Sequence, residues 1–306
     1  GQAGAEALRS AAAGGPWAEL ASLLRGQAAW RANLAVNAGR SEFSLQSNLV
    51  GMQVDLPPPL AKPAASSSLP LRLQLAPVAD AAPGRPRDSL QLELGELLKL
   101  QLQRDRSGPE PVVVRGSLAL LDALPPLPPA GWQAALKLGR VDLDAWEPLL
   151  EGLGDGAGRP GAKVPLAVQL QAEELRAGAR RLNKVKGTLS RFESGDESVW
   201  SAQLDAEQLA GEIEYRVPRG GTQAGRVQAR LQRLSVPQSE VETVEQMLSQ
   251  PPRGVPALDI VVDAFELRGR PLGRLQVLAF NRPLPGSAGL LEWQLDRLAL
   301  SMPEAQ

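Results

Sequence analysis

Apolar and polar residues alternate along most of this chain. The segment that begins at Leu258 reads LDIVVDAFELRGRPLGRLQVLAF, and every second residue is apolar as far as Val262. The alternation then slips by one position, continues through Phe265 and Leu267, and resumes at Leu275 after RGRP, which predicts a turn. A period of two residues is typical of a β-strand that has one apolar face.

The same alternation recurs in many segments, including LPLRLQL, SLQLELGELLKLQLQ, VVVRGSLAL, VPLAVQL and GEIEYRV. It predicts roughly sixteen to eighteen strands, a strand content far above that of an average domain. Gly95 and Glu96 predict a tight turn or bulge between two of them. Proline tracts at 57–59, 125–129 and 251–252 cannot join strand ladders, so we expect them in connections.

Helical patterns are few and short. They cover residues 16–26, 143–153 and 239–250, where apolar residues recur at helical spacing. The first segment opens with proline and closes with glycine, and the other two run into the connections GDGAGRPGAK and PPRG.

The chain also contains an internal repeat. VPLAVQLQAEELRAG from Val164 aligns without gaps with PALDIVVDAFELRGR from Pro256, and LPLRLQLAP from Leu69 is a weaker third copy. Each copy leads into a β-meander that we expect one helix to close. The repeat predicts a partial module with an N-terminal helix over 1–68, whole modules over 69–163 and 164–254, and a partial module over 255–306, which together form one continuous structure.

A sheet with one apolar face must cover that face with protein or with another apolar substance. Three short helices cannot cover so many strands, and aromatic residues make up only 4% of the chain. An elongated, curved, antiparallel sheet could form a trough that presents its inner face to acyl chains. A sheet folded on itself as a sandwich fits the pattern equally well.

The composition excludes several classes of chemistry. The chain has no cysteine and no histidine, which excludes disulfides, zinc sites with thiolate or imidazole ligands, and Ser-His-Asp triads. Its net charge of −1 gives no basic excess for a nucleic-acid partner. We expect no enzyme activity, no metal and no cofactor.

Charged residues suggest no catalytic site either. We interpret the carboxylate pairs Glu173-Glu174 and Asp196-Glu197 as solvated, and Asp142 with Asp144 as favourable charges near a helix start. We interpret six arginines beside the turns as residues on outward strand faces that protect the sheet edges. The alternative is that they contact lipid phosphates at the rim of a groove. They are Arg176, Arg180, Arg181, Arg268, Arg270 and Arg274.

No apolar run approaches the length of a membrane span, and no signal peptide opens the chain. The chain does not begin with methionine, and both ends have the character of ordinary internal sequence. We therefore expect a segment of a longer protein.

Several segments together resemble the AsmA-like superfamily, and within it the YhdP-type proteins. They are SNLVGMQVDLPPPLAKPA, VVVRGSLAL with GRVDLDAW, and LDIVVDAFELRGRPLGRLQV with LEWQLDRLALSMPEA. The resemblance implies a taco-like periplasmic β-groove that conducts phospholipids towards the outer membrane. It also implies anchorage in the inner membrane by an N-terminal helix, which is missing from this sequence.

This resemblance assigns the alternating apolar positions to a lipid-binding groove, whereas alternation alone fits a sealed protein core equally well. The candidate groove-lining residues are Leu71, Leu73, Leu75, Leu92, Leu94, Val112, Val114, Leu118, Leu120, Leu166, Val168, Leu170, Ile213, Tyr215, Val217, Leu258, Ile260 and Val262.

Two other functions stay open at this point. The chain could be a structural or scaffolding β-solenoid with a sealed core that binds protein partners. It could also be a carbohydrate- or peptide-binding sandwich, which six Trp, one Tyr and four Phe make less favourable because such sites use aromatic platforms.

Overall fold

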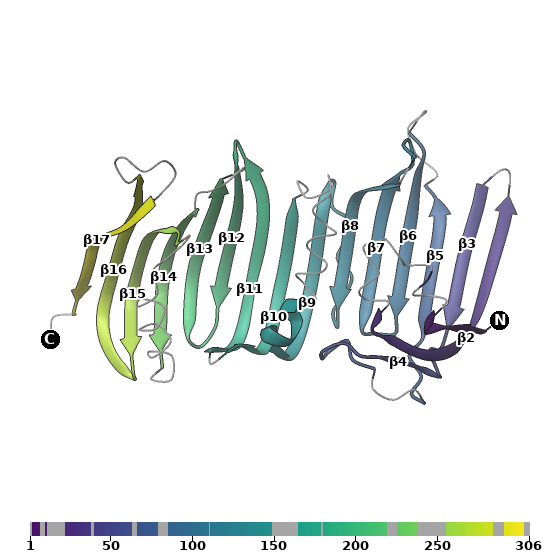
Figure 1. Cartoon of the computed structure of the whole chain (residues 1–306), viewed down its shortest axis with the longest axis horizontal. Coiled ribbons are helices and arrows are strands. Elements are labelled where there is room, and N and C mark those ends of the chain that lie inside the picture. Colours follow the sequence, from purple (N-terminus) through teal and green to yellow (C-terminus); the bar gives the residue numbers. More distant parts are fainter. Residues whose placement is uncertain are drawn as a thin grey trace. The chain divides into compact units, whose positions relative to one another are not determined.

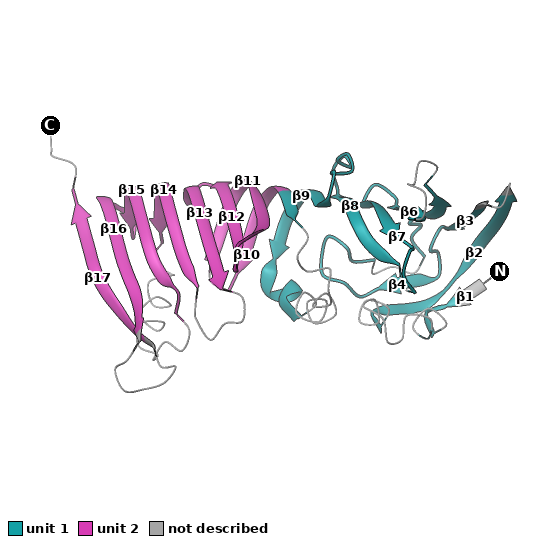
Figure 2. Ribbon diagram, turned by 90° about the horizontal axis from the view of Figure 1, so that it is seen from above, with its two compact units in different colours: residues 1–168 teal, residues 169–306 magenta. Residues whose placement is uncertain are grey.

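The computed structural model describes residues 2–6, 10, 22–37, 40–62, 66–78, 85–109, 111–148, 165–178, 180–218, 225–237, 255–283 and 291–302. These residues contain 17 strands, within the range that the alternation predicts, and little helix. The all-β class is therefore confirmed (Figure 1). The chain divides into two compact units, residues 1–168 and 169–306 (Figure 2). The division into four modules stays a prediction.

In unit 1, strands β2, β3, β5, β6, β7 and β8 pair in that order and antiparallel, and β9 then pairs parallel to β8. Strands β1 and β4 pair with the first part of β2. The strands are β1 (Gln2–Gly4), β2 (Leu24–Asn37), β3 (Arg40–Ser47), β4 (Met52–Val54), β5 (Leu71–Pro77), β6 (Arg87–Leu94), β7 (Leu98–Asp105), β8 (Val112–Leu120) and β9 (Gly131–Asp142).

Strand β10 spans the boundary between the units, and unit 2 continues with the same kind of pairing. Strands β11 to β14 are antiparallel neighbours, β15 is parallel to β14, and β16 and β17 complete an antiparallel meander. The strands are β10 (Leu166–Ala177), β11 (Arg180–Ser194), β12 (Glu197–Asp205), β13 (Leu209–Pro218), β14 (Arg226–Val236), β15 (Ala257–Leu267), β16 (Arg270–Pro283) and β17 (Leu291–Ser301).

The turns and the phase slip follow the sequence. The β6–β7 turn contains Gly95, and the β15–β16 turn contains Arg268 and Gly269, all with positive φ. The pairing of β15 with β16 shifts register between Val262 and Phe265, where the alternation slips. A β-bulge at this point explains the slip, because an extra residue turns the following side chains to the other face.

Proline-rich segments form the connections. Residues 125–129 lie in the crossover between the parallel strands β8 and β9, and residues 57–59 lie between β4 and β5. The third tract, 251–252, lies outside the described residues. In the first crossover, Arg115 donates to the carbonyl of Pro128 at 3.4 Å and Ser117 donates to the carbonyl of Pro125. The crossover therefore lies on the face of β8 that carries these two polar side chains.

The predicted helices are only partly supported. Residues 143–148 are helical, and the Asp142 carboxylate accepts the backbone N–H of Asp144 at 3.1 Å, as expected for an acidic residue at a helix start. The rest of that helix, the prediction for 239–250 and residues 16–21 lie outside the described residues.

The prediction of helix up to residue 26 is wrong, because Leu24 to Gly26 begin β2 and pair with β4. Gly26 has a φ of 86°, and a Cβ there would lie 2.1 Å from the carbonyl oxygen of Gly51. The glycine that resembles a helix stop is therefore required by the close approach of two strands.

Candidate lipid-binding faces

Leucines form continuous cross-strand rows on one face of unit 1. Residues paired across neighbouring strands share a face and lie within side-chain contact distance. We call this set the leucine face of β5 to β8: Leu71, Leu94, Leu98 and Leu120 in the first row, Leu73, Leu92, Leu100 and Leu118 in the second, and Leu75, Leu90 and Leu102 in the third.

The rows extend beyond these four strands. Leu118 pairs with Ala134 and Leu120 with Leu136 on β9, while Leu73 pairs with Leu45 on β3. Within the leucine face only Leu102 is buried, and the other leucines keep partial exposure. The face between the strand ends is therefore apolar and open to contact.

A second set of rows crosses unit 2. Paired positions run from β12 to β16 and combine large apolar and aromatic residues with alanines and a glycine. We call this set the unit 2 apolar face: Trp200, Tyr215, Val227, Leu258 and Ala279; Ala202, Ile213, Ala229, Ile260 and Val277; and Leu204, Gly211, Leu231, Val262 and Leu275.

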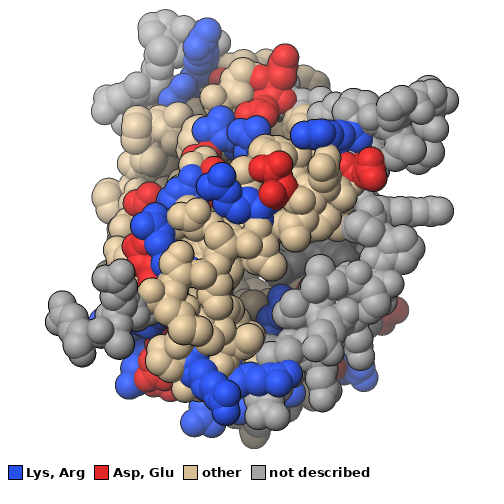
Figure 3. All heavy atoms as spheres, turned by 90° about the vertical axis from the view of Figure 1, so that its left-hand side faces the viewer, with Lys and Arg blue, Asp and Glu red and all other residues tan. Residues whose placement is uncertain are grey.

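Packing varies along the rows of unit 2. Val262 and Ala279 are fully buried, and Val262 forms a cluster with Ala229 and Leu231. At the last strand, in contrast, Leu298 of β17 is 66% exposed. Figure 3, which views the molecule from this C-terminal end, shows an uncharged area bordered above by charged residues of both signs and below mainly by Lys and Arg.

Most of the predicted residues come together in these rows. Leu71, Leu73, Leu75, Leu92, Leu94, Leu118 and Leu120 belong to the leucine face, and Ile213, Tyr215, Leu258, Ile260 and Val262 to the unit 2 apolar face. Leu166, Val168 and Leu170 are partly buried positions that alternate with exposed ones on β10. Val217 pairs with Ser198 at the edge of the rows.

Val112 and Val114 are not part of the leucine rows. The β7–β8 register shifts between Gln103 and Arg104, so that Val114 has no cross-strand partner and Val112 lies opposite Asp105. Val112 is 59% exposed at the strand start. A bulge of this kind has no sequence signal in a run of three valines.

Sequence reasoning missed an ion pair that lies in line with the leucine rows. Asp88 pairs with Arg104 across β6 and β7, one same-face step beyond Leu90 and Leu102. The guanidinium donates through Nε and Nη2 to the two carboxylate oxygens, both at 2.8 Å. The Asp88 side chain is only 4% exposed. Its spacing of two residues from Leu90 was the available signal.

The opposite face carries paired charges. In unit 2, Arg230 donates to both oxygens of Asp259 at 2.9 Å between the parallel strands β14 and β15. These hydrogen bonds lower the pKa of Asp259 and raise that of Arg230. In unit 1, Lys99 and Glu96 form an ion pair at 2.8 Å, and the hydrogen bond lowers the pKa of Glu96. These two pairs lie on the face opposite the apolar rows, whereas the Asp88–Arg104 pair lies in line with them.

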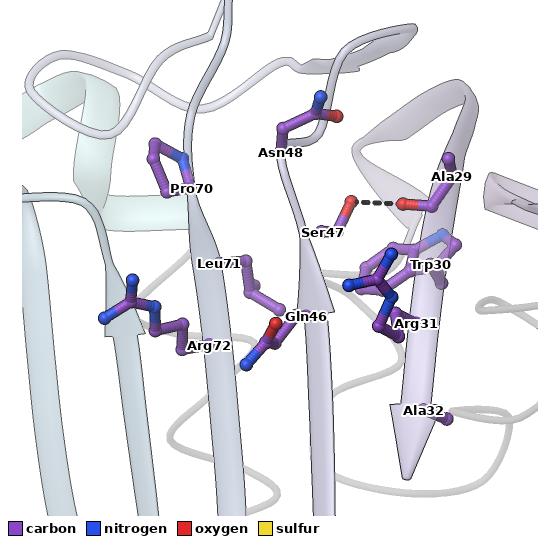
Figure 4. A pocket seen from close by; sticks show the side chains of 10 residues that line it. All are labelled: Ala29, Trp30, Arg31, Ala32, Gln46, Ser47, Asn48, Pro70, Leu71 and Arg72. Carbon is purple, nitrogen blue, oxygen red and sulfur yellow. Dashed lines mark hydrogen bonds between the residues drawn. The ribbon is translucent and has the colours of Figure 1, made fainter.

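A cavity of about 650 Å³ lies where β2, β3 and β5 adjoin (Figure 4). Arg31, Gln46 and Arg72 form one cross-strand row along it, and the Ser47 hydroxyl donates to the carbonyl of Ala29 at 2.8 Å. Its lining contains no acidic residue. With neither a carboxylate nor a histidine, this cavity offers no general acid or base.

The described residues contain no group of His, Cys, Asp and Glu that could hold a metal ion. Within the same ranges, no helix has the length and apolar character needed to cross a membrane.

Comparison with known proteins identifies one family. Residues 1–306 match the family described as YhdP protein. The searches of curated proteins and of solved structures give no significant match. Because the family match spans the whole sequence and agrees with the resemblance of the quoted segments, the chain belongs to the YhdP protein family.

Proposed function

We propose that this chain carries the acyl chains of phospholipids on its apolar sheet faces, as part of a groove that conducts lipids between the inner and outer bacterial membranes. The observation that carries the proposal is the leucine face: two of its rows cross β5 to β8 without a break, and all of its leucines except Leu102 keep partial exposure. Membership of the YhdP family supports a role in lipid transport.

Leucine rows suit a passive conductor. Burial of apolar surface stabilises by about 25 cal/mol per Å² and has no directional preference, so an acyl chain can shift along such a face without losing a specific contact. Neither an enzyme mechanism nor a cofactor is required. Asp142, Asp144, Glu173 and Asp196 are exposed, whereas Glu174 and Glu197 are partly buried, and Glu197 forms an ion pair with Arg216 at 3.4 Å.

The proposed location is the periplasm, with the full-length protein anchored in the inner membrane. This placement rests on family membership and on the lipid cargo. The candidate residues that belong to the two sets of rows would line the groove in both units, whereas Val112 and Val114 lie outside the rows and Val262 is fully buried.

Lipid uptake from vesicles tests the proposal. Leu92→Asp introduces a charge into the middle row, and Gln91→Asp introduces the same charge on the opposite face of the same strand. We expect the first variant to lose most lipid uptake and the second to retain it, with circular dichroism as the control for folding. Equal uptake by the wild type and a folded Leu92→Asp variant would contradict the proposal.

A second candidate function is a scaffold with a sealed core that binds protein partners. The fully buried Val262 and Ala279 favour it, since a dry core would bury such positions. A folded wild-type chain that takes up no lipid from vesicles would support this second function.

A further inference from the structure

The end of the leucine face at the start of β6 and the end of β7 carries a concentrated positive charge. Residues 85–88 and 104–106 contain four arginines and two aspartates, a local excess of two positive charges. The chain as a whole has a net charge of −1, so this excess is a local feature.

We call this end of the leucine face, at the start of β6 and the end of β7, the rim. The charged residues on its leucine side are Asp88, Arg104 and Arg106. Arg104 holds the Asp88 carboxylate in a bidentate pair at 2.8 Å, and Arg106 Nε lies 3.7 Å from the same carboxylate. One buried carboxylate thus faces two guanidinium groups, which leaves a positive charge beside the rows.

Both guanidinium groups have donors to spare. Arg104 uses Nε and Nη2 on Asp88, and no partner in the described part of the chain takes Nη1. Arg106 is beyond hydrogen-bond distance from Asp88, and its side chain is 59% exposed. A guanidinium has five N–H donors in a planar fork that fits phosphate oxygens.

The ion pair is costly where it lies. Across the strands Asp88 is flanked by Pro77 on β5 and Arg104 by Val113 on β8, so the neighbours in the register are apolar although Arg106 lies beside the carboxylate. Two charges in such a place lose hydration, and apolar residues of similar size often stabilise a fold equally well or better. A buried ion pair is weak evidence for stabilisation, and a contribution to ligand binding would account for charges at this position.

We propose that Arg104 and Arg106, positioned by Asp88, bind the phosphate group of a lipid whose acyl chains lie along the leucine face. This inference rests on the proposed function. Leu90 and Leu102 form the adjacent row, so an amphiphile with its headgroup at this rim would place its chains on the leucines. Charge complementarity calls for an anion, and the planar guanidinium fork together with the adjacent leucines favours the phosphate ester of a lipid.

Competition between matched lipids tests the assignment on the purified chain. Dioleoylphosphatidylglycerol and dioleoylglycerol share their acyl chains and differ in the phosphate, and each would displace a bound apolar dye. We expect the wild type to prefer the phosphate lipid by about tenfold, as one charge-assisted contact would give. Arg106→Gln should remove most of that preference and leave the affinity for dioleoylglycerol unchanged.

Arg72→Gln serves as the matched control, because Arg72 is exposed on the opposite face of β5 and makes no ion pair among the described residues. It should keep the wild-type preference. An unchanged preference in Arg106→Gln, or a loss of affinity for both lipids alike, would overturn the assignment while leaving lipid binding intact. A wild type that binds neither lipid would instead contradict the proposed function.

Titration with inorganic phosphate, followed by calorimetry, separates a headgroup site from a free-phosphate site. We expect inorganic phosphate alone to bind weakly and not to abolish the preference for the phosphate lipid. Arg106-dependent binding of inorganic phosphate, combined with no preference between the two lipids, would overturn the lipid assignment.

Discussion

Single residues contribute to these sheets according to the face that they occupy. Leu73 lies in the middle leucine row with partial exposure, and its chain neighbour Gln74 is exposed on the other side. The contribution of a residue to the stability of the fold therefore depends on which face of the strand its side chain occupies, and adjacent residues can differ greatly.

Replacement of Leu73 by alanine should lower the free energy of unfolding by about 1–2 kcal/mol, less than for a fully buried leucine because the side chain is already partly exposed. Gln74→Ala should change it by no more than about 0.5 kcal/mol. Urea denaturation measures both values. A larger loss for Gln74→Ala than for Leu73→Ala would show that the apolar face is assigned to the wrong side.

The Arg230–Asp259 pair predicts a pH dependence of stability. The hydrogen bonds from Arg230 lower the folded-state pKa of Asp259 below its unfolded value. The pair therefore stabilises the fold above about pH 4, and its contribution is lost as the pH falls through the folded pKa. Asp259→Asn should be less stable than the wild type at pH 7, and this difference should shrink in acid.

Urea denaturation of the wild type and of Asp259→Asn, at pH 7 and in acid, would measure the difference in their free energies of unfolding. Asp196→Asn, at an exposed turn position without an ion pair in the described chain, is the matched control and should follow the wild type. A difference between the wild type and Asp259→Asn that is the same at both pH values would contradict the assigned cause.

At the scale of elements, each unit combines an antiparallel meander with one parallel step. The parallel pair of β8 and β9 contains a close contact, in which the Trp132 ring lies over its partner Gly116. A Cβ on Gly116 would lie 2.4 Å from the indole ring. The aromatic ring thus fills the space that the glycine leaves in the row.

Gly116→Ala should therefore destabilise the β8–β9 pair by about 1–3 kcal/mol, because the indole must move out of a packed position. Gly139→Ala is the control, since nothing lies within 4 Å of a Cβ at that position and its φ is ordinary. Thermal unfolding compares the two variants. Equal melting temperatures would show that Trp132 does not pack on Gly116 in solution.

Elements were largely predictable from the sequence, because alternation is a local property. Strand number, the turn at Gly95 and the bulge after Val262 all follow from residues close to one another in the chain. Which strands pair with each other was not predictable, since the parallel pairing of β14 with β15 depends on contacts between segments separated by a long connection. The ion pair between Asp88 and Arg104 was not predicted either, because the two residues meet only through the register of β6 with β7.

The strand at Leu24–Gly26 shows the limit of local reasoning most clearly. Proline before and glycine after an apolar segment suit a helix, yet Gly26 is required by the carbonyl of Gly51. Tertiary contact decided the conformation against the local pattern.

At the scale of the whole molecule, the central claim is that the apolar sheet faces hold lipid. Each unit presents rows of apolar side chains on one face and ion pairs such as Arg230–Asp259 on the other, and the Asp88–Arg104 pair lies at the end of the leucine rows. This separation is expected of a sheet that faces water on one side and an apolar cargo on the other.

The measurement that tests this claim most directly is mass analysis of lipid that copurifies with the chain without detergent. We predict at least one phospholipid per chain, lost when Ile260 in unit 2 or Leu100 in unit 1 is replaced by aspartate in a variant that still folds. A folded wild-type chain that carries no lipid, and takes none up from vesicles, would contradict the account.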